Sequence, residues 1–269
     1  MYSLSNITPT VRNLALLNLA ILLAQQNVQL APSLTQLGSL YPLGSAYFHV
    51  WQFLTYMFMH SGWGHLFSNM LGLVVFGPML EQRWGARRFL AFWLLCGIGA
   101  GMLYQGIGVY ESRKLESAYA DYKASPNAYD YDRFMKESGF QEAADKQAAQ
   151  ALDRNPHDPG LLQELTARVE DAYKVLHTQP VGGMLGASGA LFGLMVAFAY
   201  LFPNTELFIL LIPFPIKAKY LVFFYSLYEL YKGVYQTPGD NVAHFAHLSG
   251  ALVGFIIVRY WERNRSEFY

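Results

Sequence analysis

Apolar residues in this chain gather into runs that approach the length a helix needs to cross a bilayer. Hydropathy predicts six membrane-spanning helices, at residues 11–30, 63–80, 89–109, 185–202, 220–235 and 242–261. A further apolar stretch, 207–215, is short and closed by two prolines, so we interpret it as an interfacial connection rather than a span. The pattern therefore predicts an all-α polytopic membrane protein.

Basic residues flank these runs unevenly. Arginines lie between the second and third runs, lysines between the fourth and fifth, and arginines again after the sixth, whereas residues 31–64 contain no Lys or Arg. By the positive-inside rule, the basic loops and both termini are cytoplasmic. The second, fourth and sixth helices then all begin at the outer side, where their ends could build one composite site.

Residues 110–180 depart from the apolar pattern. They are charged and alanine-rich, with more acidic than basic residues, and the breaker Asn155-Pro156-His157-Asp158-Pro159-Gly160 separates two helical runs, 140–152 and 161–176. We predict a small extramembrane helical insertion on the outer side, between helices three and four. The predicted organisation is helices one to three in 1–109, the insertion in 110–180, and helices four to six in 181–269.

Composition agrees with the membrane class and excludes others. The chain of 269 residues is 53% hydrophobic and only 14% charged, whereas a soluble domain carries about a quarter charged residues. Net charge is zero and no basic stripe is present, so we expect no nucleic-acid partner. Cys96 is the single cysteine, which rules out an internal disulfide, and we expect no removable signal peptide.

Polar residues that could do chemistry stand where the second, fourth and sixth helices begin. His65 and Asn69 are four residues apart and share a helix face, and both can donate hydrogen bonds. Ser188 lies between small residues at a helix start, which also presents free backbone N–H groups. With His60, His244 and His247, these residues offer a nucleophile, a base and oxyanion donors at one depth.

Other interpretations of the same residues stay open. Small residues around Ser188 also suit close helix packing, and a single buried histidine often bridges membrane helices. A zinc site built from His60, His65, His244 and His247 is a stronger competitor. Against it, no HExxH motif occurs, and we expect no carboxylate within a span to serve as base.

Taken together and in order, these motifs resemble those of the rhomboid intramembrane serine proteases. The similarity covers residues 50–109 and 181–261. The matching motifs are Gly186-Ala187-Ser188-Gly189 for G-x-S-G, His60, His65 and Asn69 for H-x4-H-x3-N, residues 246–254 for A-H-x-x-G-x-x-x-G, and Glu81-Gln82-Arg83 for E-x-R.

The resemblance implies a six-helix rhomboid-like bundle that acts without a metal or cofactor. Ser188 would attack the scissile carbonyl, and His247 would be the base in a dyad without a carboxylate. His65, Asn69 and the Ser188 N–H would hold the oxyanion. The implied substrates are single-pass membrane proteins in the lipid bilayer, cleaved near its outer boundary, with the active site opening outward.

The resemblance also implies supporting roles for neighbouring residues. His60 is the first residue of the H-x4-H-x3-N motif, and Gly186 is the first residue of the G-x-S-G motif. We prefer His247 to His244 as base because His247 is followed by Gly250 and Gly254, which would let helix six pack closely on helix four. A dimer contact is the alternative use of that glycine face. His244, one turn earlier, would lie behind the base or contact water. Phe192 stands where relatives carry a tyrosine packed on the catalytic histidine.

Two other function classes remain possible, a catalytically silent rhomboid-like protein that binds membrane clients and a metal-dependent membrane enzyme or transporter. We expect the insertion, residues 111–178, to cap the active-site mouth, dock substrates or recruit a partner. Composition and the lack of a transit peptide indicate a bacterial inner (cytoplasmic) membrane.

Overall fold

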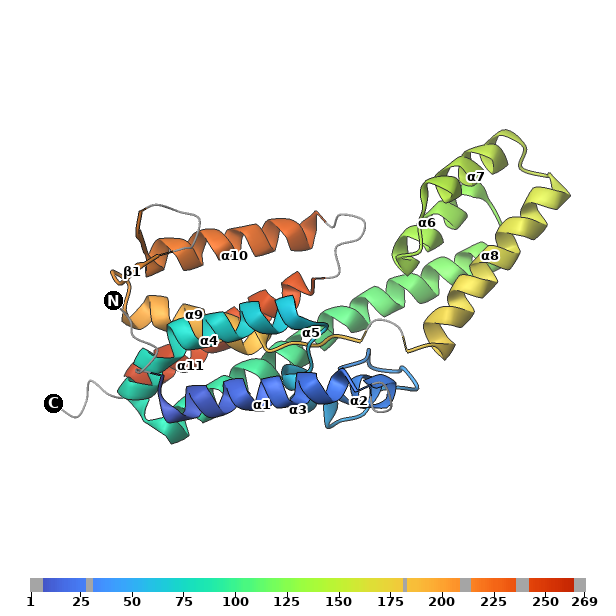
Figure 1. Ribbon diagram of the computed structural model, residues 1–269. Helices are drawn as coiled ribbons and strands as arrows, with labels where there is room; N and C mark the ends of the chain where they lie inside the picture. Colours follow the sequence, from blue (N-terminus) through green and yellow to red (C-terminus); the bar gives the residue numbers. More distant parts are fainter. Residues whose placement is uncertain (1–6, 28–30, 181–182, 209–213, 236–241, 264–269) are drawn as a thin grey trace. The chain divides into compact units, whose positions relative to one another are not determined.

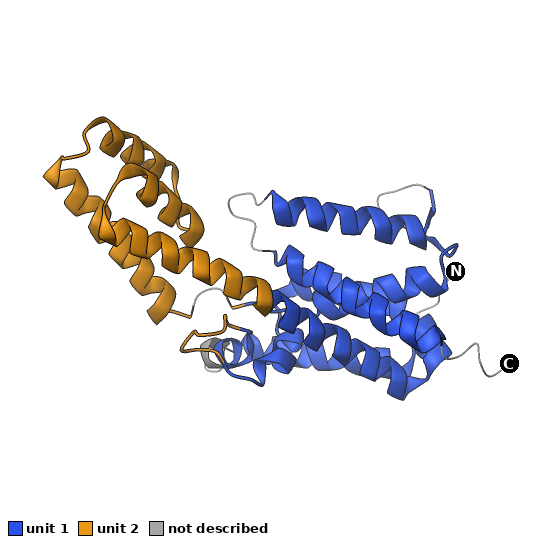
Figure 2. Cartoon of the chain, turned by 180° about the vertical axis from the view of Figure 1, so that it is seen from behind, with its two compact units in different colours: residues 1–40, 49–104, 184–269 blue, residues 41–48, 105–183 orange. Residues whose placement is uncertain are grey.

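The computed structural model describes residues 7–27, 31–180, 183–208, 214–235 and 242–263. The described chain is mostly helical (Figure 1). It divides into two compact units (Figure 2), described separately below. Unit 1 comprises Met1–Leu40, His49–Tyr104 and Met184–Tyr269, and unit 2 comprises Tyr41–Phe48 and Gln105–Gly183.

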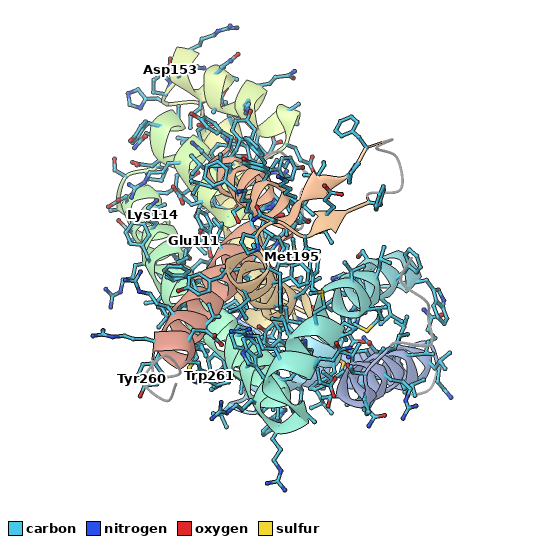
Figure 3. All side chains as sticks on the ribbon, turned by 90° about the vertical axis from the view of Figure 1, so that its left-hand side faces the viewer. Glu111, Lys114, Asp153, Met195, Tyr260 and Trp261 are labelled. Atoms are coloured by element: carbon cyan, nitrogen blue, oxygen red, sulfur yellow. The ribbon has the colours of Figure 1, made fainter. Side chains whose placement is uncertain are left out.

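Unit 1 is organised around α9, the short apolar helix Ser188–Leu201. Most of α9 is buried, as expected for a helix that is apolar on all sides. It contacts α4, α10 and α11 (Figure 1). Figure 3 labels Met195 of α9 in the interior of this unit and Tyr260 of α11, 64% exposed, on its outside. The elements of unit 1 besides α9 are α1 (Pro9–Gln25), α2 (Ala31–Gly38), α3 (Gln52–Thr55), η2 (Tyr56–Phe58), α4 (Trp63–Trp84), the first part of α5 (Ala86–Ala124), β1 (Glu206–Leu207), β2 (Ile216–Lys217), α10 (Ala218–Val234) and α11 (His244–Arg263).

Glycines bring α11 against α9 without intervening side chains. A Cβ at Gly250 would lie 1.9 Å from the carbonyl oxygen of Gly189, and one at Gly254 would lie 2.6 Å from the Cα of Gly193. Only glycine permits so close an approach of two helix backbones. The glycine face of α11 is therefore used within the chain, rather than left free for the dimer contact considered as an alternative.

Glu81 and Arg83, from the predicted E-x-R motif, tie the C-terminal end of α4 to two other helices. The Glu81 carboxylate accepts hydrogen bonds from the Thr8 hydroxyl and from the backbone N–H groups of Thr10 and Val11, where α1 begins. These are N–H groups that the helix itself cannot satisfy. Arg83 forms an ion pair with Glu262 at the end of α11. The start of α1 and the ends of α4 and α11 thus lie together.

Several predicted spans differ from the helices in extent. Among the described residues, α4 and α5 are long and apolar enough to cross a membrane, and α9 is a shorter apolar helix. The third apolar run was expected to end at residue 109, but α5 continues to Ala124. In the stretch 207–215, residues 209–213 lie outside the described part, and β1 and β2 pair antiparallel on either side of them. The six-span bundle remains a prediction.

Unit 2 has a hydrophobic core of its own. It contains the rest of α5 with α6 (Ala128–Ser138), α7 (Ala143–Arg154) and α8 (Pro159–Thr178). Tyr122, Tyr131 and Phe134 are among its fully buried side chains. The predicted breaker forms the turn between α7 and α8, where the Asp158 carboxylate caps α8 by accepting the N–H groups of Gly160 and Leu161.

Candidate active site

Ser188 and His247 lie together in unit 1, on different helices. Ser188 is the first residue of α9, and its Oγ lies 2.8 Å from Nε2 of His247 on α11. The glycine contacts between α9 and α11 make this distance possible, because they bring the two backbones together just beyond the pair. His247 is 8% exposed and Ser188 is half-buried. The geometry suits proton transfer from the hydroxyl to the imidazole.

A carboxylate lies on the other side of His247, where sequence reasoning expected none. Glu229, on α10, is 2% exposed, and its Oε2 lies 2.7 Å from Nδ1 of His247 and 2.7 Å from Nδ1 of His244. The expectation of a base without a carboxylate partner is therefore wrong. Glu229 is the one acidic residue in the predicted span 220–235, and an acidic residue in an apolar run is the sequence signal for such a partner.

The ring of Phe192 stacks on His247. Their centroids are 4.5 Å apart and the planes differ by 7°. Phe192 lies one turn after Ser188 on α9, so the helix that carries the serine also supports the flat face of the imidazole. This contact restricts the rotation of His247 while leaving both of its ring nitrogens free to bond.

His65 lies against the segment that leads into Ser188. A Cβ at Gly186 would come within 2.8 Å of Cε1 and Nε2 of His65, and Gly186 has φ +125°, which side-chain-bearing residues rarely adopt. Glycine at 186 is thus required both by its backbone conformation and by the imidazole beside it. The other nitrogen of His65, Nδ1, lies 3.1 Å from the Ser61 hydroxyl. Nε2 is therefore the nitrogen that faces Gly186, in the segment just before Ser188.

Asn69 and His60 are both buried, 3% and 2% exposed. The Asn69 amide donates to the carbonyl oxygen of His65, 3.0 Å away, so in this structure its hydrogen bond lies within α4. The His60 ring lies edge-on to that of His65, with centroids 5.0 Å apart, and its Nε2 has no hydrogen-bond partner among the described residues.

The four-histidine zinc site considered above does not form within the described residues. His60 neighbours His65, and His244 neighbours His247, as two separate pairs. Among the described residues, the side chains whose ligand atoms come within 4.8 Å of one another are Glu229, His244 and His247. Any metal hypothesis therefore shifts to that set.

Comparison with known proteins agrees with this geometry. A family model described as Rhomboid domain matches residues 47–113 and 165–263, more than half of the chain. Both matched segments contain the motif residues discussed above, and residues 114–164 lie outside the match.

Individual relatives carry rhomboid names. An uncharacterized mitochondrial rhomboid protein of Schizosaccharomyces pombe is 25% identical over 220 residues, which is 79% of this chain and 52% of that protein. RHOMBOID-like protein 2 of Arabidopsis thaliana is 40% identical over 53 residues, 20% of this chain and 17% of that protein. YdcA of Bacillus subtilis, provisionally named a rhomboid protease, is 34% identical over 76 residues, 28% of this chain and 36% of that protein.

The chain thus spans about half, or less, of the length of these relatives. The extent of the family match and the shared motifs nevertheless lead to one conclusion, which confirms the resemblance seen in the sequence: this chain belongs to the Rhomboid family.

Proposed function

We propose that the chain is an intramembrane serine endopeptidase that cleaves single-pass membrane proteins near the outer membrane boundary. One observation carries the proposal, the 2.8 Å distance between Ser188 Oγ and His247 Nε2 in a member of the Rhomboid family. A serine hydroxyl becomes a useful nucleophile when a base this close can take its proton.

In this mechanism Ser188 attacks the scissile carbonyl while His247 takes its proton and later returns it to the leaving amine. The oxyanion would be held by the Ser188 backbone N–H, by Nε2 of His65 and by Asn69. The side of His65 that faces Gly186 supports its assignment. Asn69 would first have to exchange its bond to the His65 carbonyl for one to the oxyanion.

Membrane embedding agrees with the surface of unit 1 as well as with the family. Large apolar side chains are highly exposed on its helices, including Phe67 (69%) on α4, Phe224 (64%) on α10 and Ile256 (57%) on α11. Exposed apolar side chains of this size mark a membrane or protein interaction surface, and family membership favours the membrane. The outward-opening site and cytoplasmic termini belong to the proposal on the positive-inside argument alone.

The membrane that holds the protein is a separate part of the proposal. Composition favours a bacterial inner membrane, whereas the S. pombe relative is named mitochondrial.

We also propose that residues 111–178 dock substrates or a partner, and unchanged activity and substrate range after their deletion would refute this role.

A fluorophosphonate probe tests the proposed chemistry without a known substrate. Purified protein in detergent should be labelled covalently at Ser188, and Ser188→Ala and His247→Ala should not be labelled. Ser249→Ala is the matched control, since Ser249 is also buried on α11 but belongs to no proposed step, and it should be labelled like the wild type. Absence of labelling in folded wild type would instead favour a client-binding protein without activity.

A further inference from the structure

Glu229 lies at the centre of a cluster that a serine–histidine pair does not require. Its Oε2 is 2.7 Å from Nδ1 of both His244 and His247, and all three side chains are buried, with exposures of 2%, 7% and 8%. An unpaired buried carboxylate is strongly destabilising, and more so in a membrane segment. The two imidazoles are the contacts that make its burial tolerable.

The shared oxygen restricts where the protons are. A protonated Oε2 could direct its single hydrogen at only one of the two Nδ1 atoms, whereas an ionised carboxylate accepts from both. Distances of 2.7 Å are typical of charge-assisted hydrogen bonds. The geometry favours N–H at Nδ1 of both rings. Nε2 of a neutral His247 is then the unprotonated nitrogen, the one that lies 2.8 Å from Ser188 Oγ.

We propose that Glu229 is a positioning residue that fixes the tautomer and orientation of His247, and that His244 holds the Glu229 carboxylate in place. The site would then be a serine–histidine–glutamate arrangement with a second histidine behind it. This inference rests on the proposed function. It adds α10 to the helices that build the site.

The proton balance of the reaction is unchanged by Glu229. As the bond from Ser188 Oγ to the carbonyl carbon forms, the hydroxyl proton passes to Nε2 of His247. The resulting imidazolium faces the Glu229 carboxylate, which stabilises its charge without taking the Nδ1 proton. As the carbon–nitrogen bond of the peptide breaks, the Nε2 proton passes to the leaving amine and an acyl ester remains on Ser188. Water then attacks this ester and gives a proton to Nε2. As the bond from Oγ to the acyl carbon breaks, that proton returns to Ser188, and the ring ends in its starting tautomer.

The test compares Glu229→Gln with Glu229→Asp in the full chain, measuring fluorophosphonate labelling rate, thermal stability, and kcat and KM on a cleaved single-pass reporter. We expect Glu229→Gln to lower the labelling rate and kcat by about 10²- to 10⁴-fold with KM little changed. Glu229→Asp should recover part of this loss, because it keeps the charge. Val222→Ala is the matched control, since it removes buried volume from α10 away from the site and should keep the wild-type kcat.

Substitution of His244 is a second, milder perturbation. It tests whether the Glu229 carboxylate positions His247 if Glu229→Gln does not fold. His244→Ala should lower kcat by about tenfold, and His244→Asn, whose amide can replace the Nδ1–H donor, should lower it less. A loss of the same size in both variants would overturn the role of His244.

The outcomes separate this inference from the proposed function. Wild-type rates in Glu229→Gln, with Ser188→Ala inactive, would refute the role of Glu229 and leave the protease intact. An unlabelled wild type would instead refute the protease. Activity that a chelator abolishes and zinc restores would also overturn the inference, because the three ligand atoms, within 4.8 Å of one another, would then hold a metal.

Discussion

Asp145 in unit 2 and Glu229 in unit 1 are equally buried carboxylates, but they have different kinds of partner. In unit 2, Asp145 is 2% exposed and bonds to the Arg168 guanidinium, the Tyr131 hydroxyl at 2.7 Å and the Glu142 backbone N–H at 2.8 Å. In unit 1, Glu229 is also 2% exposed, but its partners are two imidazoles, and His247 continues to Ser188.

The difference shows that burial of a charge does not by itself mark an active site. Arg168 is a permanent cation and the Glu142 N–H is a fixed donor, so neither exchanges a proton with Asp145. Asp145 therefore holds α6, α7 and α8 together and has a structural role. An imidazole can gain and lose a proton near neutral pH, so a carboxylate paired with one can support chemistry. The partners, rather than the burial, distinguish a structural carboxylate from a functional one.

The largest effect should follow from removing Ser188, the proposed nucleophile of unit 1. Ser188→Ala should lower proteolytic activity by about 10⁴-fold or more, because in the proposed mechanism Ser188 supplies the attacking oxygen. Its thermal unfolding temperature should stay within a few degrees of the wild type, since the hydroxyl is half-buried and small. Reporter cleavage and differential scanning calorimetry measure the two effects. Substantial remaining cleavage would mean that the reaction is located elsewhere.

Loss of one proposed oxyanion donor, His65, should have the next largest effect. His65→Ala should lower kcat by about 10²- to 10³-fold with a smaller change in KM, because the bond to the oxyanion forms only in the transition state. Steady-state kinetics on the same reporter would show this. His49→Ala is a suitable control, since His49 stacks on Trp51 away from the site. An unchanged kcat in His65→Ala would remove His65 from the mechanism.

Asp145→Asn tests the structural side of the comparison. It should destabilise unit 2 by about 1–3 kcal/mol by weakening the bonds to Arg168 and Tyr131. Hydrogen exchange in α6–α8 should rise, while fluorophosphonate labelling of Ser188 keeps its wild-type rate. A labelling rate that falls with unit 2 stability would contradict the separate roles of the two carboxylates.

The same residue predicts how unit 2 responds to acid. Burial pushes the pKa of Asp145 upward, but the bonds from Arg168 and Tyr131 outweigh it and hold the pKa below its ordinary value. A lowered pKa in the folded state stabilises the unit above the ordinary value of about 4, and this stabilisation is lost as pH falls through the folded-state value. Exchange protection of α6–α8, corrected for intrinsic rates, should decline there in wild type and less in Asp145→Asn.

Phe192→Tyr should have the smallest effect. Tyrosine adds a hydroxyl but keeps the aromatic ring that stacks on His247, so kcat should change by less than about threefold. Phe192→Ala sharpens the test, because it removes the ring and should lower kcat by about tenfold or more. Equal activity in both variants would show that stacking does not position the base.

Sequence reasoning could identify the residues that carry a local pattern. Ser188, His65 and His247 each stand in a short motif at a helix start, and these motifs led to the site. Glu229 carries no motif, and its role depends on α10 meeting α11, a contact between helices that spacing along one helix cannot reveal. The length of α5 was missed for a related reason. Hydropathy falls after residue 109, but Glu, Lys, Leu and Ala still favour helix, so the helix continues.

The most direct test of the central claim is cleavage of a reporter in a membrane. Purified protein would be reconstituted in lipid vesicles with a single-pass reporter that carries helix-breaking residues near one membrane boundary. Mass spectrometry would locate any cut. The account predicts cleavage near that boundary by wild type and none by Ser188→Ala. Cleavage by both, or an intact reporter with a wild type whose Ser188 is labelled, would contradict intramembrane proteolysis by this serine.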